Sequence, residues 1–200
     1  MIGLLRRLRE RDDGVTIVEF AFVAPVAIFL IAGLIEFGYV LFARSTLESA
    51  VLAAARTSRV ADCPNENAKA IEEFIQGRMD AVASADGQKA QVTVESYGQN
   101  FGNVGNPEPY DDIDGNGQRD EGESYTDING NGEWDEDMGE DGDFGSFGEV
   151  VRFTATYNVQ SLMPFISKEY ASNGKGFYSI RSVTVVRNEP FTDTTCAIDS

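Results

Sequence analysis

The sequence predicts an α+β fold in which one long N-terminal helix packs on a small antiparallel sheet. Three observations lead to this fold class. Residues 15–42 are almost wholly apolar, and helical spacing of apolar side chains continues beyond them. Of three later segments, two alternate between apolar and polar residues, as half-buried strands do, and the third is rich in Val, Ile, Ser and Thr. Between the first and second of these segments lies an acidic insert, residues 111–145, that fits neither pattern. The insert therefore interrupts the sheet.

The apolar run is long enough to cross a membrane. Its 28 residues exceed the roughly 20 that a bilayer-spanning helix needs. Basic residues before a span hold that end in the cytoplasm, so the rest of the chain is expected outside it. A secretory signal peptide would have a shorter apolar stretch. A plain anchor does not explain Glu19, because an unpaired carboxylate in a span costs about 2.5 kcal/mol or more. The basic residues are Arg6, Arg7, Arg9 and Arg11.

A resemblance to a known family begins at Gly14. The sequence Gly14-Val-Thr-Ile-Val-Glu19-Phe20 resembles a prepilin processing site, and the wider stretch resembles TadE-like minor pseudopilins of the tight-adherence (Tad/Flp, type IV-like) pilus system. Residues 35–38 (IEFG) and the closing segment 183–191 (VTVVRNEPF) are similar to the same family. The resemblance implies a pilin-like architecture and cleavage after Gly14, which makes Val15 the first mature residue and Glu19 the fifth.

The resemblance also implies an organisation and a set of partners. Glu19 would pair with the Val15 amine of a neighbouring subunit; the alternative is a side chain at headgroup depth. The expected location is the bacterial inner membrane, with a periplasmic or extracellular C-terminal domain that can enter a surface pilus. Expected partners are a prepilin peptidase, TadF-like and TadG-like proteins, the major Flp pilin and membrane lipid. The expected segments are a leader (1–14), a membrane helix (15–42), periplasmic helices with the first strand (43–110), the acidic insert (111–145), and the C-terminal strands and tail (146–200).

Beyond the membrane, the first helix is expected to reach about residue 60. A second helix is expected at 67–84 and strands at 91–97, 149–159 and 177–187, which make a sheet of three or four strands. Residues 162–170 read as a short helix or an irregular excursion. Glu36 is either solvated or in contact with a partner span. The apolar face of the second helix comprises Ile71, Phe74, Ile75, Met79 and Val82.

The two cysteines, Cys63 and Cys196, are the only ones in the chain. Cysteines in the periplasm pair readily. A disulfide between them would tie the C-terminal tail to the end of the first helix. The alternative is two free buried thiols.

The acidic insert contains a repeat that is typical of calcium loops. Residues 111–143 hold 14 acids and one base, so they carry −13 of the net charge of −17. Asp112-Ile-Asp-Gly-Asn-Gly-x-x-Asp recurs 15 residues later as Asp127-Ile-Asn-Gly-Asn-Gly-x-x-Asp. The alternation of oxygen-bearing side chains around a glycine fits a 12-residue EF-hand-type loop without its helices. The expected Ca²⁺ ligands, for two ions, are Asp112, Asp114, Asn116, Gln118 (by its carbonyl), Asp120 and Glu123, then Asp127, Asn129, Asn131, Glu133 (by its carbonyl) and Asp135. The second loop has Met138 at its twelfth position, so Asp137 or Asp141 would have to substitute there.

Composition excludes several classes of function. The chain has no His, which removes imidazole bases, Ser-His-Asp sites and His-based zinc sites. Its charge of −17 argues against a nucleic-acid partner. No nucleophile and base stand together, so no enzyme is predicted. The predicted function is that of a minor pseudopilin in pilus assembly or priming. The alternative is a single-pass, Ca²⁺-dependent surface or adhesion module with no pilus role.

Overall fold

A computed structural model describes residues 13–58, 67–142, 144–163 and 176–188. Helix α2 (Asp13–Ser58) is followed by helix α3 (Asn67–Met79) and four strands: β1 (Gln91–Ser96), β2 (Glu140–Asp141), β3 (Val150–Gln160) and β4 (Phe177–Arg187). Two short 3-10 turns, η2 (Ala85–Gly87) and η3 (Phe101–Asn103), connect them. The predicted α+β class is confirmed.

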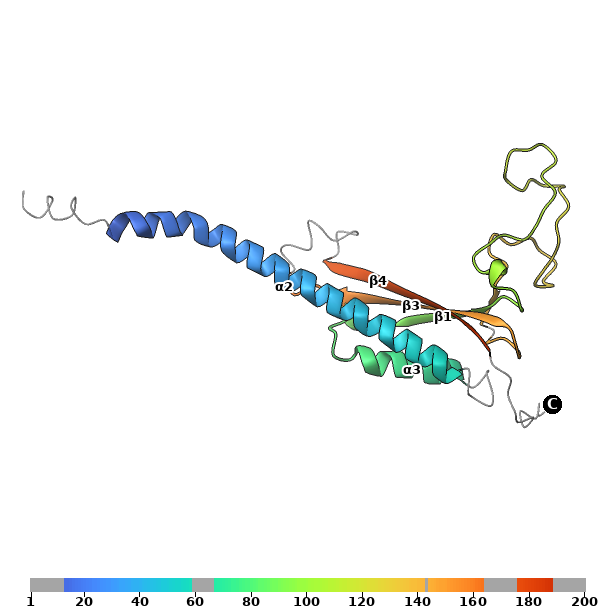
Figure 1. Ribbon diagram of the computed structural model, residues 1–200, viewed down its shortest axis with the longest axis horizontal. Helices are drawn as coiled ribbons and strands as arrows, with labels where there is room; N and C mark the ends of the chain where they lie inside the picture. The colour runs from blue at the N-terminus through green and yellow to red at the C-terminus, as the bar shows by residue number, and fades with distance from the viewer. Residues whose placement is uncertain (1–12, 59–66, 143, 164–175, 189–200) are drawn as a thin grey trace, which may run out of the picture.

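Helix α2 is one continuous element of 46 residues, about 70 Å at the usual helical rise. It contains Pro25, which removes one backbone donor without ending the helix. Its N-terminal half extends beyond the rest of the molecule, while its C-terminal half lies along the sheet (Figure 1). The sequence predicted this helix to within about two residues at its C-terminal end.

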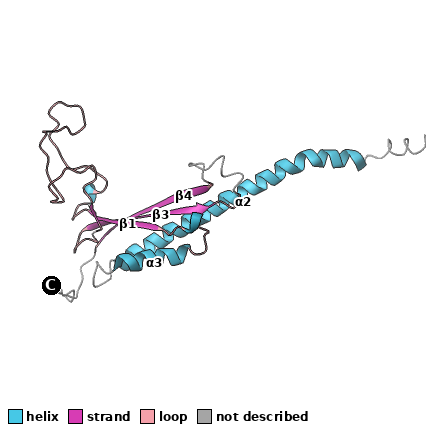
Figure 2. Ribbon diagram, turned by 180° about the vertical axis from the view of Figure 1, so that it is seen from behind, coloured by secondary structure: helices cyan, strands magenta, loops and turns pink. Residues whose placement is uncertain are grey.

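The sheet is antiparallel, in the order β2-β1-β3-β4. Strand β4 pairs with β3 over its full length, from Val150↔Arg187 to Gln160↔Phe177. The bounds predicted for this strand, 177–187, are confirmed. Strand β2 pairs with β1 at only two positions. Helices α2 and α3 cover one face of the sheet, as both views show (Figures 1 and 2).

The main core lies between the helices and that face of the sheet. Alternate residues of β3 point into it and are buried, as their spacing predicted: Val151, Phe153, Ala155, Tyr157 and Val159. Small and branched residues of α2 face them: Ala43, Leu47, Ala50, Val51 and Ala54. Small side chains on α2 let its backbone approach the sheet closely. From α3 and the turn after it, Ile71, Ile75, Met79 and Val82 complete the core. The prediction for Phe74 was wrong, because its side chain is 37% exposed, with the Arg78 guanidinium 5.2 Å from the ring centroid.

The acidic insert forms a separate lobe at the end of the sheet opposite the free end of α2 (Figure 1). We call residues 108–135 the acidic lobe. Two backbone hydrogen bonds close its neck, from the amide of Glu108 to the Asp135 carbonyl at 3.0 Å and from the amide of Met138 to the Asn106 carbonyl at 3.2 Å. The lobe therefore leaves and rejoins the sheet at one place.

Candidate functional site

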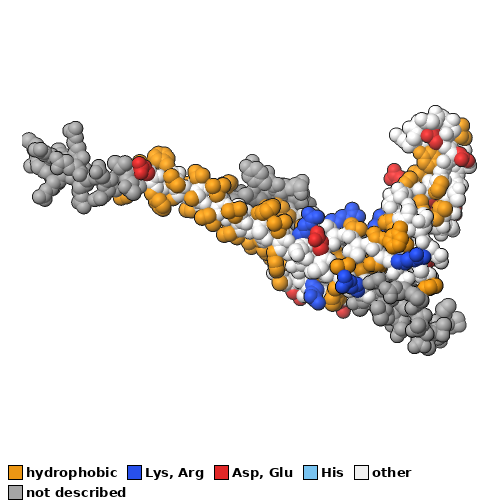
Figure 3. Space-filling view, in the orientation of Figure 1, with side chains coloured by type: hydrophobic (Ala, Val, Ile, Leu, Met, Phe, Trp, Pro, Cys, Tyr) orange, Lys and Arg blue, Asp and Glu red, His pale blue; other side chains and the backbone are white. Residues whose placement is uncertain are grey.

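The N-terminal half of α2 presents an apolar surface that no other described part of the chain covers. Residues 17–56 form a helix long and apolar enough to cross a membrane. Large side chains along it are exposed, among them Phe22 at 77% and Leu34 at 70% (Figure 3). A surface of this kind is stable in lipid and unfavourable in water. This half of α2 could therefore anchor the protein in a membrane as a single span.

The predicted processing residues lie at the start of this helix. Gly14 and Val15 are within α2, and Glu19 and Phe20 are both exposed, Phe20 by 70%. Glu19 lies one helical turn beyond Val15. Its carboxylate has no ion-pair partner among the described residues.

Glu36 is buried within the chain, so the expectation that it is solvated was wrong. Its side chain is only 5% exposed and lies beside Leu162, just after β3, and Tyr178, at the start of β4. Oε2 accepts a hydrogen bond from the Leu162 amide at 3.1 Å, and Oε1 is buried without a partner. Burial, and then the neighbouring Glu36 charge, raise the pKa of the Tyr178 phenol. Glu36 thus links α2 to the segment after β3, next to the exposed apolar N-terminal half of the helix.

The first loop of the acidic lobe wraps around the carboxylate of Asp112. Oδ1 accepts from the Gly115 amide at 2.7 Å, and Oδ2 accepts from the Gly117 amide at 2.8 Å. Gly117 stands at the sixth loop position with φ of +77°, a conformation that other residues resist. These backbone hydrogen bonds, above all that from Gly117, hold the pKa of Asp112 below its ordinary value. Asp112 therefore stays ionised under mildly acidic conditions.

Three carboxylates of the first loop converge. Asp112, Asp114 and Glu123 each bring an oxygen within 4.8 Å of the others. The Asn116 side chain lies among them and donates to Asp114 at 3.0 Å and to Asp120 at 2.8 Å. Several oxygens around one point, drawn from carboxylates and amides, are the ligands that Ca²⁺ prefers. The first loop thus brings its predicted side-chain ligands together.

The second loop repeats this geometry 15 residues further along. Asp127 accepts from the Gly130 amide at 2.6 Å and from the Gly132 amide at 2.9 Å, as Asp112 does in the first loop. The side chains of Asn129 and Asn131 both donate to Asp135 Oδ2, at 2.8 and 2.6 Å. The sequence repeat is therefore also a structural repeat.

The seventh positions of the two loops match as well. The Gln118 amide donates to Asn116 Oδ1 at 2.6 Å, and the Glu133 amide donates to Asn131 Oδ1 at 2.7 Å. These two bonds turn the chain in the same way at both loops.

The closing residue of the second loop is one that sequence reasoning missed. Glu123 closes the first loop by accepting from the amides of Ile113 (2.8 Å) and Asp120 (3.0 Å). Glu108 makes the equivalent contacts in the second loop, to the amides of Ile128 (2.6 Å) and Asp135 (3.4 Å). Glu108 is 0% exposed. The signal was present, because Glu108 and Glu123 are themselves 15 residues apart.

The residues considered as substitutes for Met138 at the twelfth position make other contacts. Asp137 accepts from Arg152 Nη2 at 2.6 Å, and Asp141 belongs to strand β2. Met138, at the twelfth position of the second loop, is buried with Tyr97 and Val150 in a small cluster against the sheet. A packing residue thus stands at the twelfth position, and the glutamate that contacts the second loop comes from ahead of the first loop.

Arg152 attaches the lobe to the sheet. Its guanidinium makes a bidentate pair with Glu95, at 2.7 and 2.6 Å, and the bond to Asp137 described above. It also lies 4.9 Å from the Tyr97 ring centroid. The two carboxylates, Glu95 foremost, raise the pKa of Arg152, and burial foremost raises that of Tyr97. The Arg152 side chain thus holds Asp137, where the chain leaves the lobe, against strands β1 and β3.

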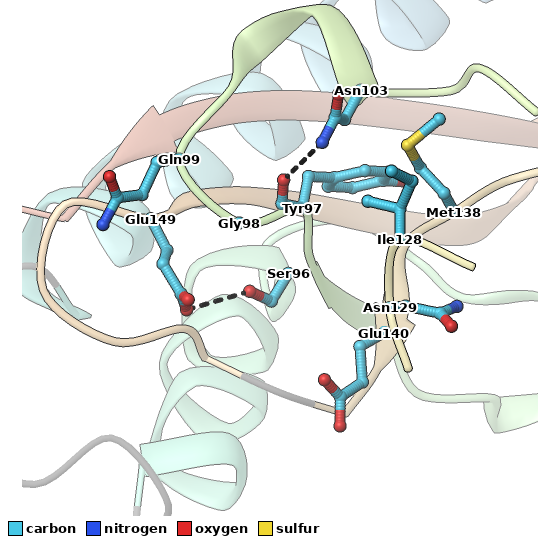
Figure 4. A pocket seen from close by; sticks show the side chains of 10 residues that line it. All are labelled: Ser96, Tyr97, Gly98, Gln99, Asn103, Ile128, Asn129, Met138, Glu140 and Glu149. Carbon is cyan, nitrogen blue, oxygen red and sulfur yellow. Dashed lines mark hydrogen bonds between the residues drawn. The ribbon is translucent and has the colours of Figure 1, made fainter. Parts of the chain in front are cut away.

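A pocket of about 320 Å³ lies between the lobe and the sheet (Figure 4). The end of β1 and the second loop both line it, the loop through Ile128 and Asn129. Ser96 donates to Glu149 Oε2 at 3.3 Å, and Asn103 donates to the Tyr97 carbonyl at 3.2 Å. The polar lining indicates a hydrated junction rather than a second apolar core.

The predicted disulfide between Cys63 and Cys196 falls on residues outside the described parts of the chain. The same is true of most of the predicted excursion at 162–170.

The comparisons with known proteins bear on the helix and not on the lobe. Residues 14–56 match the family model described as TadE-like protein. No curated protein and no solved structure matches the chain. The matched segment begins at the glycine of the predicted processing site and covers nearly all of α2. The N-terminal helix of this protein is therefore similar to TadE-like proteins.

Proposed function

We propose that this protein is a minor pseudopilin that takes part in the assembly or priming of a Tad/Flp-type pilus. The observation that carries the proposal is the TadE-like match at 14–56, on a helix whose N-terminal half is apolar and uncovered. The basic residues ahead of this half favour a cytoplasmic N-terminus, with the sheet and lobe in the periplasm or outside the cell. A prepilin peptidase, the TadF-like and TadG-like proteins and the Flp pilin are the proposed partners.

Processing by a prepilin peptidase is the first step of this proposal. Cleavage after Gly14 frees the α-amine of Val15, and the exposed Glu19 of a neighbouring subunit pairs with it. The two charges are costly separately in lipid and less costly together. The pair would set the register between adjacent helices.

The processing step predicts the mature N-terminus. When the full chain is expressed with its peptidase, N-terminal sequencing should show a protein that begins at Val15. Gly14→Val should block cleavage, because the peptidase recognises a glycine before the cut. Gly3→Val, a matched change within the leader, should be cleaved normally. A protein that begins elsewhere, or equal cleavage of the two variants, would contradict the pseudopilin proposal and favour a plain membrane-anchored surface module.

We also propose that the acidic lobe binds two Ca²⁺ ions and is stabilised by them. The converging oxygens of Asp112, Asp114 and Glu123 support the first site. The matching hydrogen bonds at Asp127, and the position of Glu108, support the second. Bound Ca²⁺ would offset the self-repulsion of the acids and stabilise the periplasmic domain.

A further inference from the structure

We infer that the two loops bind cations as one cooperative unit, in which each loop is closed by the glutamate that precedes the other. Glu123 closes the first loop and leads into the second; Glu108 closes the second loop and leads into the first. This inference rests on the proposal that the lobe binds Ca²⁺. It assigns the closing ligand of the second site to Glu108, which lies outside both 12-residue loops.

Burial of the two closing carboxylates points to a cation. Glu108 is 0% exposed and Glu123 is 7% exposed. Neither forms an ion pair with a Lys or Arg in the parts of the chain that the structure describes. Buried carboxylates are normally paired with a base or coordinated to a metal, because an uncompensated charge is costly away from water. Backbone amides satisfy part of their hydrogen bonding, and a cation would supply the missing positive charge.

The two closing glutamates are mechanically linked. Each stands four residues ahead of the first aspartate of the other loop, so residues 108–112 and 123–127 are the connecting segments. These segments pair with each other, through the amide of Asp111 to the Ser124 carbonyl (2.9 Å) and the amide of Thr126 to the Pro109 carbonyl (2.8 Å). The two donors, Asp111 and Thr126, are equivalent residues of the repeat, and so are the two acceptors. The lobe therefore has approximate two-fold symmetry.

Side chains at the centre of the lobe follow the same symmetry. The Arg119 guanidinium lies 4.8 Å from the Tyr125 ring centroid, and the equivalent Trp134 meets Tyr110 edge-on at 5.9 Å. Arg119 Nη2 donates to the Glu123 carbonyl at 3.3 Å, and Trp134 Nε1 donates to the Glu108 carbonyl at 2.9 Å. Arg119 and Trp134 also contact each other, at 5.6 Å. Each loop therefore touches the closing glutamate of its own site and the centre that both share.

Coupling follows from this arrangement. A cation in the second loop fixes Glu108, and through the short segment 108–112 it positions Asp112 of the first loop. A cation in the first loop fixes Glu123 and positions Asp127 in the same way. The first cation thus orders part of the second site, so the second cation binds at a smaller cost. The expected result is positive cooperativity.

The test is a Ca²⁺ titration of the full chain in detergent micelles. Calorimetry should count two ions with a Hill coefficient above one, and the fluorescence of Trp134, the only tryptophan in the chain, should follow the same curve. Glu108→Gln should weaken binding at one site by roughly tenfold or more and reduce the Hill coefficient to one. Glu123→Gln should mirror this effect on the first loop. Glu108→Asp, which keeps the charge but shortens the reach, should behave like Glu108→Gln.

The matched controls remove the same charge from exposed positions of the repeat. Glu121→Gln and Glu136→Gln, which are equivalent residues 15 apart, should keep both ions and the cooperativity. If the wild-type chain binds no Ca²⁺, the calcium proposal fails and the inference fails with it. If the wild type binds two ions independently, or if Glu108→Gln titrates like Glu121→Gln, only the inference is overturned. Circular dichroism of each variant separates loss of a ligand from loss of the fold.

Discussion

At the scale of single residues, Arg152 joins the lobe to the sheet. Its pair with Glu95 is largely shielded from solvent, since the side chains are 14% and 16% exposed. The pair between Arg44 and Glu48 on α2 has a similar bond length, 2.9 Å, but its side chains are 62% and 52% exposed. Because solvent screens exposed charges, the two pairs should contribute very differently to stability.

The change Arg152→Met should lower the free energy of unfolding by about 3 kcal/mol, because it leaves two carboxylates without their cation. The measurement is urea denaturation of the full chain in micelles, followed by circular dichroism. As a matched control, Arg44→Met should cost less than about 0.5 kcal/mol. Equal losses from the two variants would show that burial of the Arg152 pair does not govern its contribution.

Residue positions also show where sequence reading stops. Asp112, Gly117 and their partners in the second loop were found, because a motif gives their spacing. Glu108 was missed, because it contacts the second loop only after the chain has passed through the whole first loop. A contact of that kind depends on the path of the chain in space, and only the 15-residue spacing to Glu123 indicated it.

At the scale of elements, the face of α2 that meets the sheet is lined by small residues. Ala50 is 1% exposed and belongs to the core cluster between α2, α3 and strands β3 and β4. A larger side chain would force the helix away from the sheet, because the core is already filled by close contacts. Replacement of small residues on this face is therefore a direct probe of the helix–sheet contact.

The change Ala50→Leu should destabilise the domain by about 1–3 kcal/mol through overpacking. Ser45→Leu, on the exposed side of the same helix, should change stability by less than about 0.5 kcal/mol. Thermal unfolding of the two variants and the wild type, under identical detergent conditions, gives the comparison. A neutral Ala50→Leu would mean that α2 does not pack on the sheet as closely as described.

The strands differ in how well their sequences predicted them. Periodicity located strand β3 to within one residue, and strand β4 was located by its content of Val, Ile, Ser and Thr. Strand β2 was not predicted, because two residues cannot show a period. Phe74 was placed in the core by its spacing, yet α3 turns it toward Arg78 at the surface. Periodicity identifies a face, whereas the depth of burial depends on which elements pack there.

At the scale of the whole molecule, the charge of −17 divides into −13 on residues 111–143, which include most of the acidic lobe, and a nearly neutral remainder. Two bound Ca²⁺ ions would offset four of these charges. Without them, like charges within one small lobe repel each other and favour open conformations. The lobe should therefore respond to Ca²⁺ while the sheet and helices do not.

Limited proteolysis with chymotrypsin should show this difference, because Tyr110, Tyr125 and Trp134 are cleavage sites within the lobe. Millimolar CaCl₂ should slow cleavage in the lobe by about tenfold or more and leave cleavage elsewhere unchanged. The double variant Asp112→Ala with Asp127→Ala should lose this protection. A second double variant, Glu121→Ala with Glu136→Ala, removes the same charge and should keep it. Identical rates with and without Ca²⁺ would argue against cation stabilisation of the lobe.

The closed neck has a consequence for how the chain tolerates change. Because Asn106 and Met138 are joined by a backbone hydrogen bond, the whole segment between them behaves as one long excursion with adjacent ends. Closure entropy rises only slowly with the length of such an excursion. The register of β1 against β3, from Gln91↔Thr156 to Ser96↔Val151, is thus compatible with a lobe of any size, or with a short turn in its place. The lobe can therefore be removed or replaced as a unit while the pairing of β1 with β3 stays the same.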